Sequence, residues 1–147
     1  MMIKTIDEFL NLFLLKPSFS YVKVGRDYFL DNDDFNLFLS NSSLRPVSQG
    51  GFLGRDDKFF EPSLFLLEYL SKYSKNKVFL NDEAAWLFLC GRDAFMSSIE
   101  KNNASSAICL VQNSFDENLG YGVISKHKGK KIMRNLKDRG DFLRREK

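Results

Sequence analysis

Basic side chains are concentrated at the C-terminal end of the chain, where they could bind anions. Residues 126–147 contain ten Lys or Arg and three acids, a net charge of +7. Because the whole chain of 147 residues has a net charge of +3, the preceding 125 residues carry −4. This asymmetry indicates a polyanionic partner, either nucleic acid or an acidic membrane surface. The competing interpretation is that the charges only solvate an exposed surface.

Groups that usually carry catalysis or bind metals are few. His127, the only histidine, lies between two lysines, so a surface position is expected for it rather than a role as general base. Cys90 and Cys109 do not make a zinc knuckle or a disulfide framework. The glycines of segment 50–54 lack the Lys-Ser/Thr of a phosphate-binding loop, and the acids of segment 31–35 lack the Gly and Glu of a calcium loop. The sequence therefore predicts a binding protein rather than an enzyme, with no cofactor and no metal.

The composition is that of a folded protein in a reducing compartment. Hydrophobic residues make up 44% of the chain, which is ample for a packed core, and two cysteines are few. The apolar run 9–15 follows two acids, unlike a signal peptide, and no segment approaches the roughly 18 apolar residues of a membrane span. No amphipathic helix with exposed aromatic residues accompanies the basic end, so no membrane partner is expected. The expected location is the cytoplasm, or the nucleolus if the source is eukaryotic.

The first half of the sequence alternates short helices and short strands. Thr5 and Glu8 have the spacing of a capping box, which predicts a helix that runs to Leu15. A hairpin is expected next, with strands 20–24 and 28–30. The other elements expected in this half are a short helix from Asp33, a strand 47–53, a turn 54–57, a return strand 58–60, and a helix from Pro62 to Ser74 with Leu64, Leu67, Leu70 and Tyr73 facing the core.

The second half is richer in strands. Segment 75–77 is the best candidate boundary and divides the chain into domains 1–75 and 76–147. Several short strands with one helix near the start suit a small barrel-like sheet. The elements expected here are a strand 78–80, a helix 84–89 capped by residues 81–83 and ended by Gly91, strands 93–100, 107–112 and 119–124, and a polar turn 113–118.

The basic end itself alternates between charged and apolar residues. Segment 130–136 fits a strand, although Ile132, Leu136 and Leu143 also fit a helical stripe. Apolar residues placed between the charges, with Phe142 and Leu143 expected in the core, favour a packed element over a free tail.

Three segments of the second half resemble a PUA domain, a small RNA-binding module. They are the helix 83–90 with its terminal Gly91, the glycine-punctuated segment Leu-Gly-Tyr-Gly-Val at 119–123, and the closing segment Asp-Arg-Gly-Asp-Phe-Leu-Arg-Arg-Glu at 138–146. The chain as a whole resembles the Nip-seven family of ribosome-biogenesis factors, in which a PUA domain follows a pre-PUA domain. The segments that carry this wider resemblance are 26–29, 51–54, 58–59, 70–79, 88–91 and 119–122.

The resemblance implies an α+β protein, with an N-terminal α/β pre-PUA domain of helices and a small antiparallel sheet before a C-terminal PUA-type β-barrel. It implies a non-catalytic RNA-binding protein of rRNA processing or ribosome biogenesis, which binds rRNA or pre-rRNA and contacts other proteins through its N-terminal domain. Because PUA domains also serve tRNA modification, a tRNA-binding accessory subunit or enzyme fragment is the alternative. A pure protein-interaction module is a third possibility.

The resemblance also places the RNA contacts, at the glycine turn after the first PUA helix and along the basic end of the barrel. Arg suits such a site because its planar fork bridges phosphate oxygens or stacks on an unpaired base. Gly91 has a second interpretation as a helix C-cap, and Arg144 and Arg145 could bind phosphate or pair with acids. The candidate RNA-binding residues are Gly91, Arg92, Lys126, Lys128, Lys130, Lys131, Arg134, Lys137 and Arg139.

Overall fold

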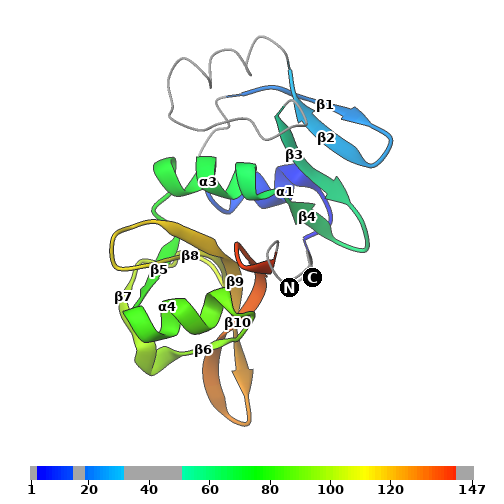
Figure 1. Cartoon of the computed structure of the whole chain (residues 1–147). Coiled ribbons are helices and arrows are strands. Elements are labelled where there is room, and N and C mark those ends of the chain that lie inside the picture. Colours follow the sequence, from blue (N-terminus) through cyan, green and yellow to red (C-terminus); the bar gives the residue numbers. More distant parts are fainter. Residues whose placement is uncertain (1–2, 15–18, 32–50, 142–147) are drawn as a thin grey trace. The chain divides into compact units, whose positions relative to one another are not determined.

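The computed structural model describes residues 3–14, 19–31 and 51–141, which belong to two compact units, Met1–Tyr73 and Ser74–Lys147 (Figure 1). The chain is a mixed α+β protein, as the sequence predicts. The helix expected from Asp33 and the expected core residues Phe142 and Leu143 lie outside the described residues.

The first unit contains a four-stranded antiparallel sheet in the order β1-β2-β3-β4, with two described helices. Burial of aromatic rings joins helix and sheet: the rings of Phe9 and Phe60 lie 5.3 Å apart, and both side chains are buried. The elements are α1 (Ile6–Asn11), β1 (Tyr21–Val24), β2 (Asp27–Leu30), β3 (Phe52–Asp56), β4 (Phe60–Pro62) and α3 (Leu64–Tyr73).

Local signals in this unit are largely confirmed. The Thr5 hydroxyl accepts a hydrogen bond from the backbone N–H of Glu8 at 3.1 Å, as an N-cap should. The helix nevertheless ends at Asn11 instead of running to Leu15. The predicted hairpin is present, with Val24 paired to Asp27 across the turn.

Further boundaries predicted in this unit are wrong, and strand pairing explains the first. Segment 54–56 continues strand β3 instead of turning, because it pairs with β2 on one side and with β4 on the other. A Cβ on Gly54 would lie 2.6 Å from a ring carbon of Phe60, so glycine lets that ring pack against the strand. Pro62 therefore ends strand β4, and helix α3 begins at Leu64. Of the predicted core stripe, Leu67 and Leu70 are fully buried, while Tyr73 is 56% exposed at the end of the helix.

The second unit is a curled sheet of six strands in the order β6-β10-β9-β8-β5-β7, with helix α4 lying along it (Figure 1). Only the β5–β8 pair is parallel among the pairs of described strands. Apolar side chains of α4 and of the concave face form the core, including Phe88, Val111 and Met133. The elements are β5 (Lys77–Leu80), α4 (Asp82–Leu89), β6 (Ala94–Phe95), η1 (Met96–Ser98), β7 (Ile99–Asn102), β8 (Ile108–Gln112), β9 (Asn118–His127) and β10 (Lys130–Asp138).

The single strand predicted at 93–100 is wrong, and the reason is tertiary. Strand β6 pairs with β10 at one edge of the sheet, whereas β7 pairs with β5 at the other edge. The chain crosses between the two edges within one 3₁₀ turn, Met96–Ser98, which brings the edges together into a barrel-like arrangement. A continuous strand could not change partners in this way.

The basic segment forms the last described strand. Residues 130–138 are strand β10, so the strand interpretation holds and the helical one is wrong. The pairing of β10 with β9 is interrupted by a bulge between Asn135 and Lys137. The bulged backbone passes so close to β9 that a Cβ on Gly120 would overlap the carbonyl oxygen of Lys137. The glycines of segment 119–123 therefore let the two strands approach each other.

Candidate functional site

The tip of the β9–β10 hairpin carries most of the candidate basic residues. His127 pairs with Lys130, which leaves the two-residue loop Lys128-Gly129. Both loop residues have positive φ, 52° and 81°, the requirement of a type I′ turn that matches the twist of paired strands. Regular pairing up to the turn means that the exposed cations here sit on an ordered scaffold rather than on a loose arm.

The pairing register sorts these cations onto two faces of the hairpin. Side chains directly opposite each other in a sheet share a face. Met133 is fully buried in the core, so Lys131 two residues earlier and its partner Lys126 continue the inner face beyond the core. Lys130 and Arg134 lie on the outer face and are exposed.

Lys126 and Lys131 border a hollow of about 490 Å³ between the hairpin and the segment that follows β7. Two like charges directly opposite each other destabilise a strand pair. Among the residues that the structure describes, neither lysine is found in an ion pair with an acid. The other residues that line this hollow are Asn102, Ala104, Ser105, Ser106, Ala107, Ile124 and Ser125.

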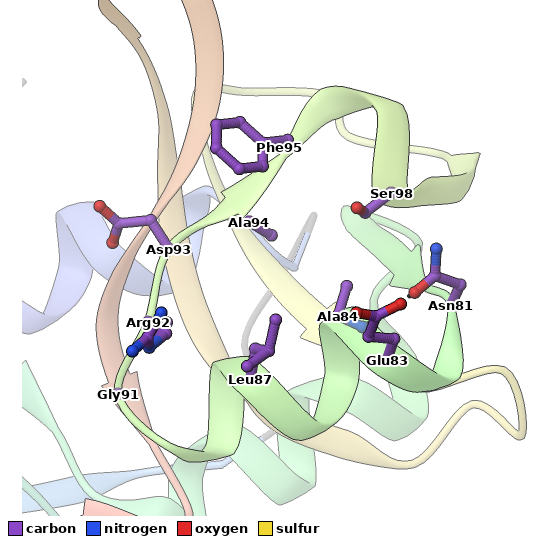
Figure 2. A pocket seen from close by; sticks show the side chains of 10 residues that line it. All are labelled: Asn81, Glu83, Ala84, Leu87, Gly91, Arg92, Asp93, Ala94, Phe95 and Ser98. Atoms are coloured by element: carbon purple, nitrogen blue, oxygen red, sulfur yellow. Dashed lines mark hydrogen bonds between the residues drawn. The ribbon is translucent and has the colours of Figure 1, made fainter.

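Gly91 and Arg92 lie in the turn after α4, at a second hollow of about 610 Å³ (Figure 2). Asn81 caps the start of this helix by accepting from the Ala84 N–H at 2.8 Å. At the other end the Gly91 N–H donates to the carbonyl oxygen of Phe88, and Gly91 has a φ of 90°, which only glycine adopts readily. Gly91 therefore ends the helix directly after the cap residue Cys90. Arg92, the next residue, is exposed and lines the hollow.

Lys137 and Arg139 differ from the other candidates because they are half-buried beyond the bulge of β10. The Arg139 guanidinium donates from Nε to the carbonyl oxygen of Asn118 at 2.6 Å, and its backbone N–H donates to Leu119. This arginine thus holds the start of β9 in place. The structure does not bring these two residues together with the hairpin tip.

Phe95 is a feature of this region that the sequence pattern missed. It lies on β6 directly opposite Ile132 and is 68% exposed. Because segment 93–100 was expected to be one strand, no partner strand could be assigned to it from the sequence. The only signal was an aromatic residue close behind Arg92, and that signal is weak without the pairing register.

Groups for catalysis or metal binding do not gather in the described ranges. Within 3–14, 19–31 and 51–141, no three His, Cys, Asp or Glu side chains lie close enough together to hold a metal ion. Burial raises the pKa of the Cys109 thiol to about 12. None of the helices in the described part of the chain is long and apolar enough to cross a membrane.

The second unit is a small curled sheet. Its glycine-ended helix α4 precedes the segment β6-η1-β7, which crosses between the two sheet edges, and this is the architecture of a PUA domain. A solved structure described as a conserved PUA domain protein from Thermoplasma acidophilum has this fold. Its TM-score to this chain is 0.53 at 22% identity, and the match covers 67% of this chain and 71% of that one. At this identity the likeness concerns the fold alone.

Sequence comparison gives the family of the second unit. Residues 76–147 match the model of the UPF0113 PUA domain and form a PUA domain of the UPF0113 family. A UPF0113 protein of Archaeoglobus fulgidus is 35% identical over 115 residues, which are 71% of this chain and 66% of that protein. The chain thus matches just under two thirds of this relative's length. The PUA domain predicted from the sequence is confirmed.

Proposed function

We propose that this protein is a non-catalytic RNA-binding protein that holds RNA on the exposed cations of its PUA domain. The observation that carries the proposal is the β9–β10 hairpin. Lys126, Lys128, Lys130, Lys131 and Arg134 are all exposed on it, and none of them has an ion-pair partner among the described residues. PUA domains are generally RNA-binding, which supports the same proposal.

The physical basis is the exchange of counterions for lysine and arginine. RNA carries one phosphate charge per nucleotide, and each phosphate that a protein cation neutralises releases bound counterions. Opposed charges such as Lys126 and Lys131 cost the free protein stability, and a bound polyanion removes that cost. RNA binding would therefore relieve a repulsion that the fold itself leaves unsatisfied.

The cellular role proposed here is rRNA processing or ribosome biogenesis, with rRNA or pre-rRNA as the ligand. Its support is the resemblance of the chain to the Nip-seven family, in which residues 1–75 would be the pre-PUA domain and would bind other proteins. Gly91 and Arg92 at the α4 turn, together with Lys137 and Arg139, are proposed as further contacts on the same RNA. Cross-linking in cells followed by sequencing of the bound RNA separates rRNA from tRNA, which the alternative role requires.

The direct test is a triple substitution on the hairpin, Lys130→Ala, Lys131→Ala and Arg134→Ala, measured with a single-stranded RNA by fluorescence anisotropy at several salt concentrations. The three side chains are exposed, so the fold should survive. Affinity should fall at least tenfold at low salt. The slope of log K against log salt should become shallower by about 2, because up to three phosphate contacts disappear and each contributes about 0.7.

A matched control removes the same charge elsewhere. Lys4, Lys72 and Lys75 are exposed, and their replacement by Ala should leave RNA affinity within about twofold of the parent. Equal losses in both triple variants would mean that only net charge matters and that the hairpin is not the site. A parent protein that binds no RNA even at low salt would overturn the proposed function.

A further inference from the structure

Phe95 stands among cations on the outer face of the PUA sheet. Its strand partner is Ile132, so the neighbours of Ile132 on the same face, Lys130 and Arg134, lie on the two diagonals from Phe95. Diagonal neighbours across a strand pair are about 7–8 Å apart, within reach of long side chains. An aromatic ring is thereby flanked by one positive charge on each side.

The Phe95 ring contributes little to the packing of the described residues. Phe95 is 68% exposed, and it has no aromatic or cation–π partner among the residues that the structure describes. Its neighbour Ala94 packs into the core on the other face of the strand. Burial in the core therefore does not account for the aromatic ring at position 95, whose notable feature is its place between two cations.

Figure 2 shows that Phe95 also borders the hollow that runs alongside α4, across from Leu87 and Glu83. Among the described residues that line this hollow, Arg92 is the only basic one, and Glu83 and Asp93 are acidic. The Asp93 carboxylate also accepts a hydrogen bond from the backbone N–H of Asn135 at 2.8 Å. A phosphate would be repelled by the two acids. A nucleobase would not be repelled, because it is neutral. It also offers a flat face that can stack on the Phe95 ring and N–H groups that can donate to a carboxylate.

We propose that Phe95 is a stacking platform for an unpaired RNA base, with Lys130 and Arg134 binding the phosphates on either side of it. This inference rests on the proposed RNA binding and adds a preference for single-stranded over duplex RNA. Stacking on an aromatic side chain tolerates any base, because every base has a π-face. In a duplex the bases are already stacked and paired, so the platform selects single-stranded RNA.

The experiment compares Phe95→Ala and Phe95→Leu with the parent protein, using a 12-nucleotide single strand and a duplex of the same sequence. Loss of one base–aromatic stack weakens binding about five- to 150-fold. Both variants should lose at least fivefold on the single strand and less than twofold on the duplex. Phe115→Ala is the control, because Phe115 is 80% exposed in the turn before β9 and should have no effect on either RNA.

A second readout detects the stack directly. The chain has one tryptophan, so the double variant Trp86→Phe, Phe95→Trp places the only indole at position 95. Single-stranded RNA should quench its fluorescence and preserve affinity, while the same strand with abasic nucleotides at saturation should not quench it. This signal depends on a ring–base contact and would not arise from a structural role of the side chain.

The outcomes separate the two proposals. If neither the parent nor any variant binds RNA, the proposed function fails and this inference falls with it. If the parent binds but Phe95→Ala binds the single strand equally well, RNA binding stands and the stacking platform is wrong. Equal losses on single strand and duplex, or quenching by the abasic strand, would likewise overturn the platform.

Discussion

Replacing Gly120 by Ala should be strongly destabilising, because the residue stands where β9 meets the bulge of β10. Gly120 has a φ of 147°, a backbone conformation that side-chain-bearing residues rarely adopt. A Cβ there would overlap the Lys137 carbonyl oxygen and lie 2.8 Å from the Cα of Asp138. These neighbours are backbone atoms of a paired strand, so they cannot rotate away as a side chain could.

The size of the effect follows from two contributions. A non-glycine residue held in a sparsely populated backbone region costs about 1–3 kcal/mol. Overpacking against a fixed neighbour costs a further ~1–3 kcal/mol. Their sum, about 2–6 kcal/mol, is a large fraction of the ~5–15 kcal/mol that stabilises a typical domain. For a domain of this size, even the lower end lowers the melting temperature by about 8 °C.

Gly129→Ala is the matched control, because Gly129 also has a positive φ, 81°, but nothing lies within 4 Å of its Cβ position. It should cost only the ~1–2 kcal/mol of a left-handed residue. Urea unfolding followed by circular dichroism and by the fluorescence of Trp86, which belongs to the second unit, measures both. If Gly120→Ala costs no more than Gly129→Ala, the close approach of β10 to β9 is not a constraint and the reasoning is wrong.

Two further predictions concern the hairpin turn and the first unit. Lys128→Asn should raise the free energy of unfolding by roughly 0.5 kcal/mol, since Asn tolerates the φ of 52° better than Lys. The same change should weaken RNA binding slightly and lower the salt slope of log K by less than 1. A loss of stability would contradict the turn type. Burial would raise the pKa of Asp56, but hydrogen bonds from Lys23 and Tyr28 outweigh it and hold the pKa below its usual value near 4. The stability that this carboxylate adds is therefore present at neutral pH and lost as the pH falls through the lowered pKa. Asp56→Asn should flatten the decline of the free energy of unfolding between about pH 5 and pH 2, measured by circular dichroism during urea titration. An unchanged decline would contradict this reasoning.

Residues that act on the backbone of their sequence neighbours were sufficient to predict many of the helix ends and turns. Thr5 was recognised as an N-cap because its partner is three residues away, and Gly91 as a helix end because a positive φ there needs glycine. The hairpin 21–30 was recognisable because a short turn forces its two strands to pair. Glycine, proline and capping residues act on the backbone within a few residues, so a sequence exposes them directly.

Signals that depend on the partner strand were not available in the same way. Gly54 was expected in a turn because glycine suits one, yet it pairs with both β2 and β4 and therefore lies in strand β3. Segment 93–100 was expected to be one strand because nothing local marks the change of partner at Met96. Burial of Met133 against exposure of Arg134 likewise follows from which face meets the core.

By itself, the sequence determined that the chain contains a PUA domain, that its basic residues gather at the C-terminal end, and that segment 130–136 belongs to a packed element. Tertiary structure alone decided how those cations are distributed: Lys126 and Lys131 at one hollow, Lys130 and Arg134 around Phe95, and Arg139 committed to a backbone carbonyl. The physical reason is that charge and glycine spacing are properties of the chain. The face on which a side chain stands is set by the register between strands that lie far apart in sequence.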